Sequence, residues 1–188
     1  LARAPRQRLQ AEFIRDHALA VSGLLVDKRG GAGVHPYQPA VLFGRNAIGA
    51  AGASFKQGSG DDLYRRSLYT YWKRQIPAAN MRILGANGRN ACRTRRERTN
   101  TPLQALVLLN DPQFVEAARV LAERIMKEGG ADIHTRLAFA FRLSTSRLPS
   151  PAELSILHAE FNNRLKEFKA SPEATKAYLD GGGARKPD

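Results

Sequence analysis

The stretch between residues 92 and 112, CRTRRERTNTPLQALVLLNDP, constrains the fold more than any other part of the chain. Asn100 or Thr101 can cap a helix that begins at Pro102, because a short side-chain oxygen accepts an orphan backbone N–H and proline fits the first helical turn. The pair Asp111-Pro112 repeats this signal ten residues later. The stretch therefore predicts a short helix, a sharp corner and then a long helix.

The short helix carries apolar residues on most of its sides, which predicts that it is buried: Leu103, Leu106, Val107 and Leu109. The long helix is predicted over 112–128, where one face is apolar and Gly129-Gly130 follow as a stop signal. A further helix is predicted over 132–143, with Asp132 as its cap.

The region after residue 150 predicts two more helices. Ser150-Pro151-Ala152-Glu153 is a capping box that opens a helix reaching about Lys169. Its apolar residues recur at spacings of three and four, which predicts a face packed on a core: Leu154, Leu157, Phe161, Leu165 and Phe168. A last short helix begins at Ser171-Pro172, and the glycine-rich end, residues 181–188, is predicted to be a disordered tail.

The first half of the chain is less regular. A helix is predicted over residues 5–25 from its apolar face. Residues 28–60 hold eight glycines and two prolines without a sustained period, which predicts a long irregular loop that is either functional or disordered.

A second helix in this half is predicted from Asp61 or Asp62 to about Lys73, because apolar and aromatic residues recur at helical spacing. Pro77 ends it, and residues 77–101 are predicted as a basic loop. Together these patterns predict one mostly α-helical domain over residues 1–180. It has about six helices, antiparallel hairpins near the C-terminus and one long Gly/Pro-rich excursion.

The most prominent candidate site is the arginine run Arg93, Arg95, Arg96 and Arg98. A guanidinium matches phosphate, sulfate or carboxylate with a planar fork, and a helix N-terminus just beyond adds a favourable dipole. The alternative is that the arginines tie a loop to Glu97, to other carboxylates and to helix C-termini within the protein. That alternative is favoured because structural ion-pair networks give the same pattern.

Aromatic and basic residues also interleave just before this run. Arg65 and Arg66 lie close to Tyr71 and Trp72, and such a mixture can bind bases or sugars by stacking and charge. The favoured alternative is that the aromatic rings lie in the core and the arginines are solvated or paired, because one apolar face on a helix suffices to explain the pattern. Tyr37, in the proline-stiffened segment 34–39, is a further candidate for aromatic contact.

Composition narrows the classes of partner and of chemistry. The net charge of +13 favours acidic partners: nucleic acid, anionic glycan, a membrane surface or an acidic sister domain. One cysteine excludes an internal disulfide and a CxxCH haem attachment on this chain, and the four histidines show no metal-ligand spacing. No apolar run reaches transmembrane length, and Leu1 is expected to be an internal start because no hydrophobic signal core follows it.

No catalytic motif emerges from the sequence. Carboxylates that could act in glycoside cleavage remain candidates only by elimination, namely Asp61, Asp62, Glu97 and Asp111, and Asp111 is better explained as a helix cap. Nucleic-acid binding rests on charge alone, because no helix-turn-helix, RRM or zinc-finger pattern is present.

Four segments carry a resemblance to a known family: DKRGGAGVHPYQP (27–39), RRSLYTYWKR (65–74), RRERTNTPLQALVLLNDPQFVEAARVLAERI (95–125) and RLPSPAEL (147–154). From about Arg8 to Leu154 the chain resembles the uncharacterised C-terminal domain of large planctomycete proteins that often carry a cytochrome-c-like domain near their N-terminus. The family brings no established activity and no catalytic residues. The resemblance implies a piece of a larger exported or envelope protein in organisms rich in sulfatases, with any haem c on another domain.

The chain departs from that family pattern just ahead of its cysteine. Such domains usually have acidic residues at three positions where this chain has Gly85, Gly88 and Asn90. If those carboxylates pair with the arginine run, this chain has lost partners and carries more exposed positive charge. The leading hypothesis is a non-catalytic structural or binding domain of a larger envelope protein. A second hypothesis, within the binding class, is that the arginines hold an acidic glycan: Arg93, Arg95, Arg96 and Arg98, together with Arg65 and Arg66. An enzyme domain in polysaccharide degradation and a nucleic-acid-binding domain are the alternatives.

Overall fold

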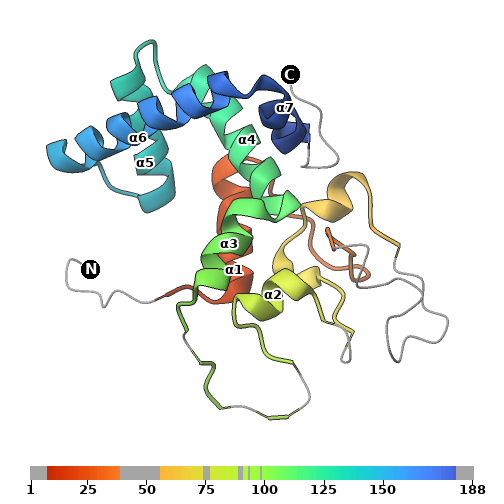
Figure 1. Ribbon diagram of the computed structural model, residues 1–188. Helices are drawn as coiled ribbons and strands as arrows, with labels where there is room; N and C mark the ends of the chain where they lie inside the picture. Colours follow the sequence, from red (N-terminus) through yellow and green to blue (C-terminus); the bar gives the residue numbers. More distant parts are fainter. Residues whose placement is uncertain are drawn as a thin grey trace.

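The structure is a computed structural model that describes residues 8–38, 56–73, 77–88, 91–92, 94–97 and 99–180. Within these ranges the chain forms seven α-helices, two short 3₁₀ helices and no β-strand, so the expected mostly α-helical class is confirmed. The α-helices, shown in Figure 1, are α1 Ala11–Ser22, α2 Ala79–Ile83, α3 Pro102–Asn110, α4 Pro112–Glu128, α5 Ile133–Thr145, α6 Pro151–Ala170 and α7 Pro172–Asp180.

Three predicted helix starts are confirmed, at Asp111, Asp132 and Ser150. The side chain of each accepts a hydrogen bond from a backbone amide in the first turn of its helix. The donors are Gln113 N to Asp111 at 3.0 Å, His134 N to Asp132 at 2.8 Å and Glu153 N to Ser150 at 3.3 Å. These bonds satisfy backbone amides that the helix itself leaves unpaired. In each bond the donor and the acceptor are only two or three residues apart in the sequence.

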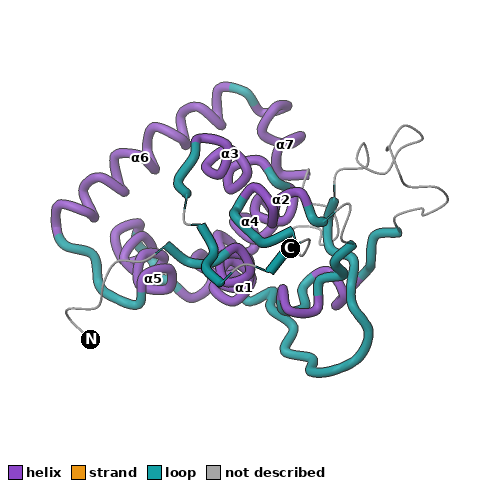
Figure 2. The backbone as a smooth tube through the Cα atoms, turned by 90° about the horizontal axis from the view of Figure 1, so that it is seen from below, coloured by secondary structure: helices purple, strands orange, loops and turns teal. Residues whose placement is uncertain are grey.

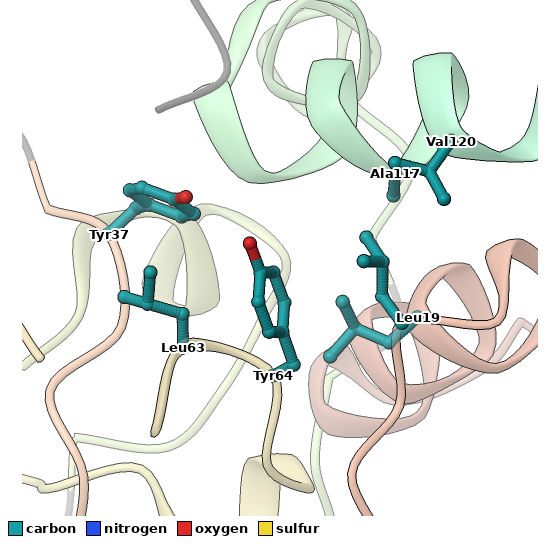
Figure 3. Close-up of a cluster of buried hydrophobic side chains, with 7 residues drawn as sticks. Leu19, Tyr37, Leu63, Tyr64, Ala117 and Val120 are labelled. Atoms are coloured by element: carbon teal, nitrogen blue, oxygen red, sulfur yellow. The ribbon is translucent and has the colours of Figure 1, made fainter. Parts of the chain in front are cut away.

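The main core lies between α1, α4 and irregular segments packed beside them (Figure 3). Leu19 of α1 meets Ala117 and Val120 of α4, and the remaining members come from outside the α-helices: Leu24, Tyr37, Leu63 and Tyr64. A second cluster joins the starts of α1 and α4 to α2 through Ala11, Ala78, Met81, Leu84 and Phe114. The α1–α4 pair is therefore the axis on which the domain is built.

The other helices are arranged along this axis. Helices α5, α6 and α7 lie at one end of it and α2 lies at the other (Figure 1). Viewed from below, α1, α2 and α3 gather around α4, while α6 runs along the edge of the molecule (Figure 2). Helices α5 and α6 contact each other, as expected for a hairpin.

The helix predicted from Asp61 or Asp62 to Lys73 is wrong. This segment forms two 3₁₀ helices, Gly60–Leu63 and Ser67–Tyr69, and then continues extended. Its backbone bonds to other parts of the chain instead: Val26 N donates to Tyr64 O at 3.1 Å, and Val34 pairs with residues 69 and 71. Tertiary contacts have overridden a local helical period.

The described parts of the long loop, residues 28–38 and 56–60, contain no α-helix, as expected. They are packed nonetheless, because Val34 and Tyr37 are buried and isolated bridges join Val26 to Arg65 and Val34 to Thr70. The centre of the loop (39–55) and the predicted tail (181–188) lie outside the described residues.

The ends of α1 differ from the predicted 5–25. The helix begins at Ala11, and residues 5–7 lie outside the described residues. It ends at Ser22 because Gly23 takes a left-handed φ of 82°, so that the amides of Leu24 and Leu25 both bond to Leu19 O. The predicted 77–101 loop also contains α2, which is too short to show a helical period.

Two predictions of burial are wrong. In α3, Leu103, Leu106 and Leu109 are more than half exposed, because the face that packs inward is narrow and carries Gln104. The α6 stripe is not a core either, since no residue of α6 is buried. A wide apolar surface therefore remains on these two helices.

Candidate anion-binding site

A cavity of about 220 Å³ lies beside the N-terminal end of α1. Three segments line it: residues 8–10 before α1, residues 84–85 after α2 and residues 94–97 of the arginine run. A second, more open depression continues from it over Arg95, Arg96, Glu97 and Thr99. The structure thus brings part of the arginine run to a helix N-terminus, although to that of α1 and not of α3.

The first turn of α1 contributes both amides and a carboxylate to this region. The side chain of Gln10, at the N-cap position, makes no capping hydrogen bond, so the terminal amides have no side-chain cap. Glu12, in the same turn, forms an ion pair with Arg96, whose NH1 lies 2.6 Å from Glu12 Oε2. Arg96 is therefore held by an internal carboxylate, as the structural interpretation of the run expected.

Arg95 differs from its neighbour. Its side chain is exposed and forms no hydrogen bond or ion pair with any residue that the structure describes, yet it lines both the cavity and the depression. An unpaired guanidinium beside a helix N-terminus is suited to an anion, because both favour negative charge. Arg93 and Arg98, the other members of the run, lie outside the described residues.

Gln104 fixes the walls of the cavity. This side chain is 3% exposed and reaches four groups: it accepts from Arg8 NH1 at 2.6 Å and Thr101 N at 3.1 Å, and it donates to Ile83 O and Thr99 Oγ1. It thereby ties the start of α3 to the end of α2 and to Arg8. The sequence signal for this residue is its spacing of three from Thr101, as in a capping box.

Arg65 and Arg66 do not reach the cavity. Arg65 is buried, donates to the carbonyls of Lys28, Gly30 and Ala32, and lies 3.9 Å above the ring of Tyr69. These contacts hold the glycine-rich loop in place. Arg66 is half exposed and lies 3.7 Å from Asp16, in a separate open groove beside α1.

The three candidate aromatic residues are dispersed. Tyr37 lies in the core, where its hydroxyl donates to Glu116 at 2.9 Å, and burial raises its pKa well above the usual value. Tyr71 is half exposed, and its ring contacts that of His35 in a tilted arrangement with ring centroids 4.8 Å apart. Trp72 packs against the second core cluster. These residues do not form one stacking platform.

Sequence reasoning missed the most connected buried side chain, Arg15. It is 1% exposed and donates to Gln113, Ser67 and the carbonyls of Leu63 and Arg65. Burial lowers its pKa to about 10, which leaves it charged at neutral pH. The sequence of α1 gives no signal of this role, since the acceptors lie 48 to 98 residues away along the chain.

A family model matches residues 1–161, and it is described as PSD1, a protein of unknown function (DUF1553). The chain belongs to this family. This confirms the resemblance to an uncharacterised domain. No match was found among curated proteins or among solved structures.

In this PSD1 domain the candidate carboxylates are separated from one another. Asp61 and Asp62 are exposed in the first 3₁₀ helix, whereas Glu97 lines the cavity. Asp111 caps α4, and burial raises its pKa against the opposing effect of its bond from Gln113 N. Among the described residues, the PSD1 domain shows no group of three potential metal ligands and no helix suited to crossing a membrane.

Proposed function

We propose that this PSD1 domain is a non-catalytic binding domain that holds an acidic glycan, sulfated or carboxylated, at the cavity beside the N-terminus of α1. The observation that carries the proposal is Arg95, an exposed guanidinium without a partner among the described residues, in a cavity also lined by Arg8 and Arg96. Sulfate and carboxylate groups accept hydrogen bonds in the geometry that a guanidinium offers.

The distribution of charge supports this placement. Residues 1–101 hold 18 Lys and Arg against 6 Asp and Glu, whereas residues 102–180 hold ten of each. The excess charge therefore belongs to the half of the chain that forms the cavity. Such a field attracts polyanions and raises their local concentration.

The family resemblance adds an argument at Gly85. This residue lines the same cavity, and the resemblance implies an acidic residue at its position. A carboxylate at this point would compete with an external anion for the arginines. Its absence leaves the cavity more positive in this chain.

The wider context that goes with this proposal is a larger exported or envelope protein of planctomycete type, located in the periplasm or cell envelope. Other domains of the same polypeptide are then further partners, and any haem c lies on one of them. A glycan-binding domain is useful there because it holds a polymeric substrate near other domains by raising its effective concentration.

The test compares heparin with a DNA duplex of equal charge density, titrated into the full chain across a salt series. We expect heparin to bind more tightly at moderate salt, and Arg95→Ala to weaken heparin binding about tenfold, the loss of one charge-assisted contact. Arg142→Ala is the matched control, because Arg142 is an exposed arginine on α5 that forms no ion pair with a described residue. It removes the same charge far from the cavity.

Three results contradict the proposal. Equal heparin and DNA affinities that vanish together with salt mean counterion release from a basic surface only. Equal effects of Arg95→Ala and Arg142→Ala mean that no shaped site exists. Turnover of the polysaccharide that Glu97→Ala abolishes would replace the non-catalytic function by the enzyme alternative.

A further inference from the structure

An apolar surface runs from α6 through α7 to the end of α3. Phe161, Leu165 and Phe168 follow one another on α6, and the ring of Phe168 lies 6.3 Å from that of Tyr178 on α7. The Tyr178 hydroxyl in turn donates to Leu109 O at 2.9 Å, which joins α7 to α3. The α6–α7–α3 surface consists of six side chains that are each 38% to 64% exposed: Leu109, Phe161, Leu165, Phe168, Tyr178 and Leu179.

The size of this surface matches one side of a stable interface. Six large apolar side chains at these exposures present roughly 500 Å². A standard interface covers roughly 800 Å² on each partner, and about 65% of that area is apolar when the partners are copies of one chain. The surface is thus as large as the apolar part of a homodimer interface.

The charge of the surrounding helices is also compatible with a second copy. Residues 102–180 carry no net charge, so two such halves do not repel one another. Helix α6 lies at the end of the molecule opposite α2 (Figure 1), so pairing through α6 keeps the two basic halves apart. An external acidic partner, by contrast, gains nothing from a neutral surface.

The apolar residues of α6 have the same spacing when the helix is followed from either end, so two antiparallel copies of the helix can match their apolar faces. Its apolar residues are spaced 3, 4, 4 and 3 apart and are therefore symmetric about Phe161: Leu154, Leu157, Phe161, Leu165 and Phe168. Helix α5 leaves Leu154 and Leu157 half-buried, so they too remain accessible in part. A two-fold axis beside Phe161 brings that residue against its own copy and places Leu157 near Leu165 of the second copy.

The charges of α6 follow the same symmetry. Its first ten residues carry Glu153 and Glu160 and no Lys or Arg, whereas its last ten carry Arg164, Lys166 and Lys169 against Glu167. Arg147 pairs with Glu153, and Arg164 pairs with Glu160 and Glu167, so Lys166 and Lys169 are the cations that face a second copy. Antiparallel pairing places the acidic half of one helix beside the basic half of the other. We infer that the α6–α7–α3 surface is a homodimer interface, in which two copies of this chain pair through antiparallel α6 helices about an axis beside Phe161.

The first test measures the oligomeric state of the full chain by sedimentation velocity, from about 1 to 100 µM, the range in which modest interfaces dissociate. We expect a dimer that forms within this range. Phe161→Glu sets two carboxylates face to face and should weaken dimerisation at least about tenfold. Ile156→Glu is the control: Ile156 is more exposed than Phe161 but lies five residues away, about 140° around the helix.

The second test reports the position of the axis. In a Cys92→Ser background, which removes the exposed native thiol, Phe161→Cys should form a disulfide-linked dimer under mild oxidation and Ile156→Cys should not. Circular dichroism of each variant confirms that the monomer is folded. A monomer throughout the concentration range, equal sensitivity to Ile156→Glu, or cross-linking at position 156 in place of 161 each overturns the inference.

Discussion

Removing Arg15 should destabilise the fold more than any surface substitution, because this side chain connects three separated segments. It joins α1 to Gln113 on α4 and to the 63–67 segment, with donor–acceptor distances of 2.6 to 3.2 Å. In Arg15→Ala, Leu63 O keeps a donor, Gln113 Nε2 at 3.2 Å. Arg65 O and Gln113 Oε1 each lose the bond from Arg15 that satisfies them within the core.

The size of the effect follows from those two acceptors. Each buried acceptor left unsatisfied costs about 1–3 kcal/mol, and the deleted stem leaves a cavity. We therefore expect Arg15→Ala to lower the free energy of unfolding by about 3–5 kcal/mol, a large part of the total of about 5–15 kcal/mol for a domain. Arg15→Lys should cost roughly half as much, because an ammonium keeps the charge but cannot reach acceptors on both sides.

The assay is urea unfolding followed by circular dichroism at neutral pH. Arg29→Ala serves as the control, because Arg29 is 86% exposed and lies 3.7 Å from Asp27, so its loss should change the free energy by no more than about 0.5 kcal/mol. A loss below about 1 kcal/mol for Arg15→Ala would refute the reasoning. So would an Arg15→Lys variant as stable as the wild type.

Two further predictions concern carboxylates. Tyr64→Phe removes a 2.9 Å hydrogen bond to the buried Glu116 and should cost about 1.5–3 kcal/mol in the same assay, and a value near zero would show that the bond contributes nothing. At the start of α6, bonds from Arg147 and from Ser150 N lower the pKa of Glu153 from 4.5 to about 2. The stabilisation by Glu153 is therefore complete above pH 4.5 and is lost as the pH falls towards 2. Glu153→Gln should flatten the dependence of the unfolding midpoint on pH in that window, and an unchanged slope would contradict this.

The candidate site could be predicted only in part. The sequence identified the arginine run as a candidate site, and Arg95 and Arg96 do line one cavity. It could not show that Arg96 pairs with Glu12, nor that the cavity lies at the start of α1 and not of α3. Arg65 illustrates the same difficulty, since its acceptors are carbonyls of a loop 33 to 37 residues away.

The sequence by itself determined where the helices after residue 100 begin, because a cap is a contact between residues two or three positions apart. Asp111, Asp132 and Ser150 carry that information in their own side chains. Only the tertiary structure decided what the rest of the chain does. Residues 61–73 have a helical period but form 3₁₀ helices and an extended segment, whose backbone bonds to distant parts of the chain. The apolar faces of α3 and α6 lie on the surface. Periodicity shows that a face is apolar, but burial depends on which other segment the fold brings against it.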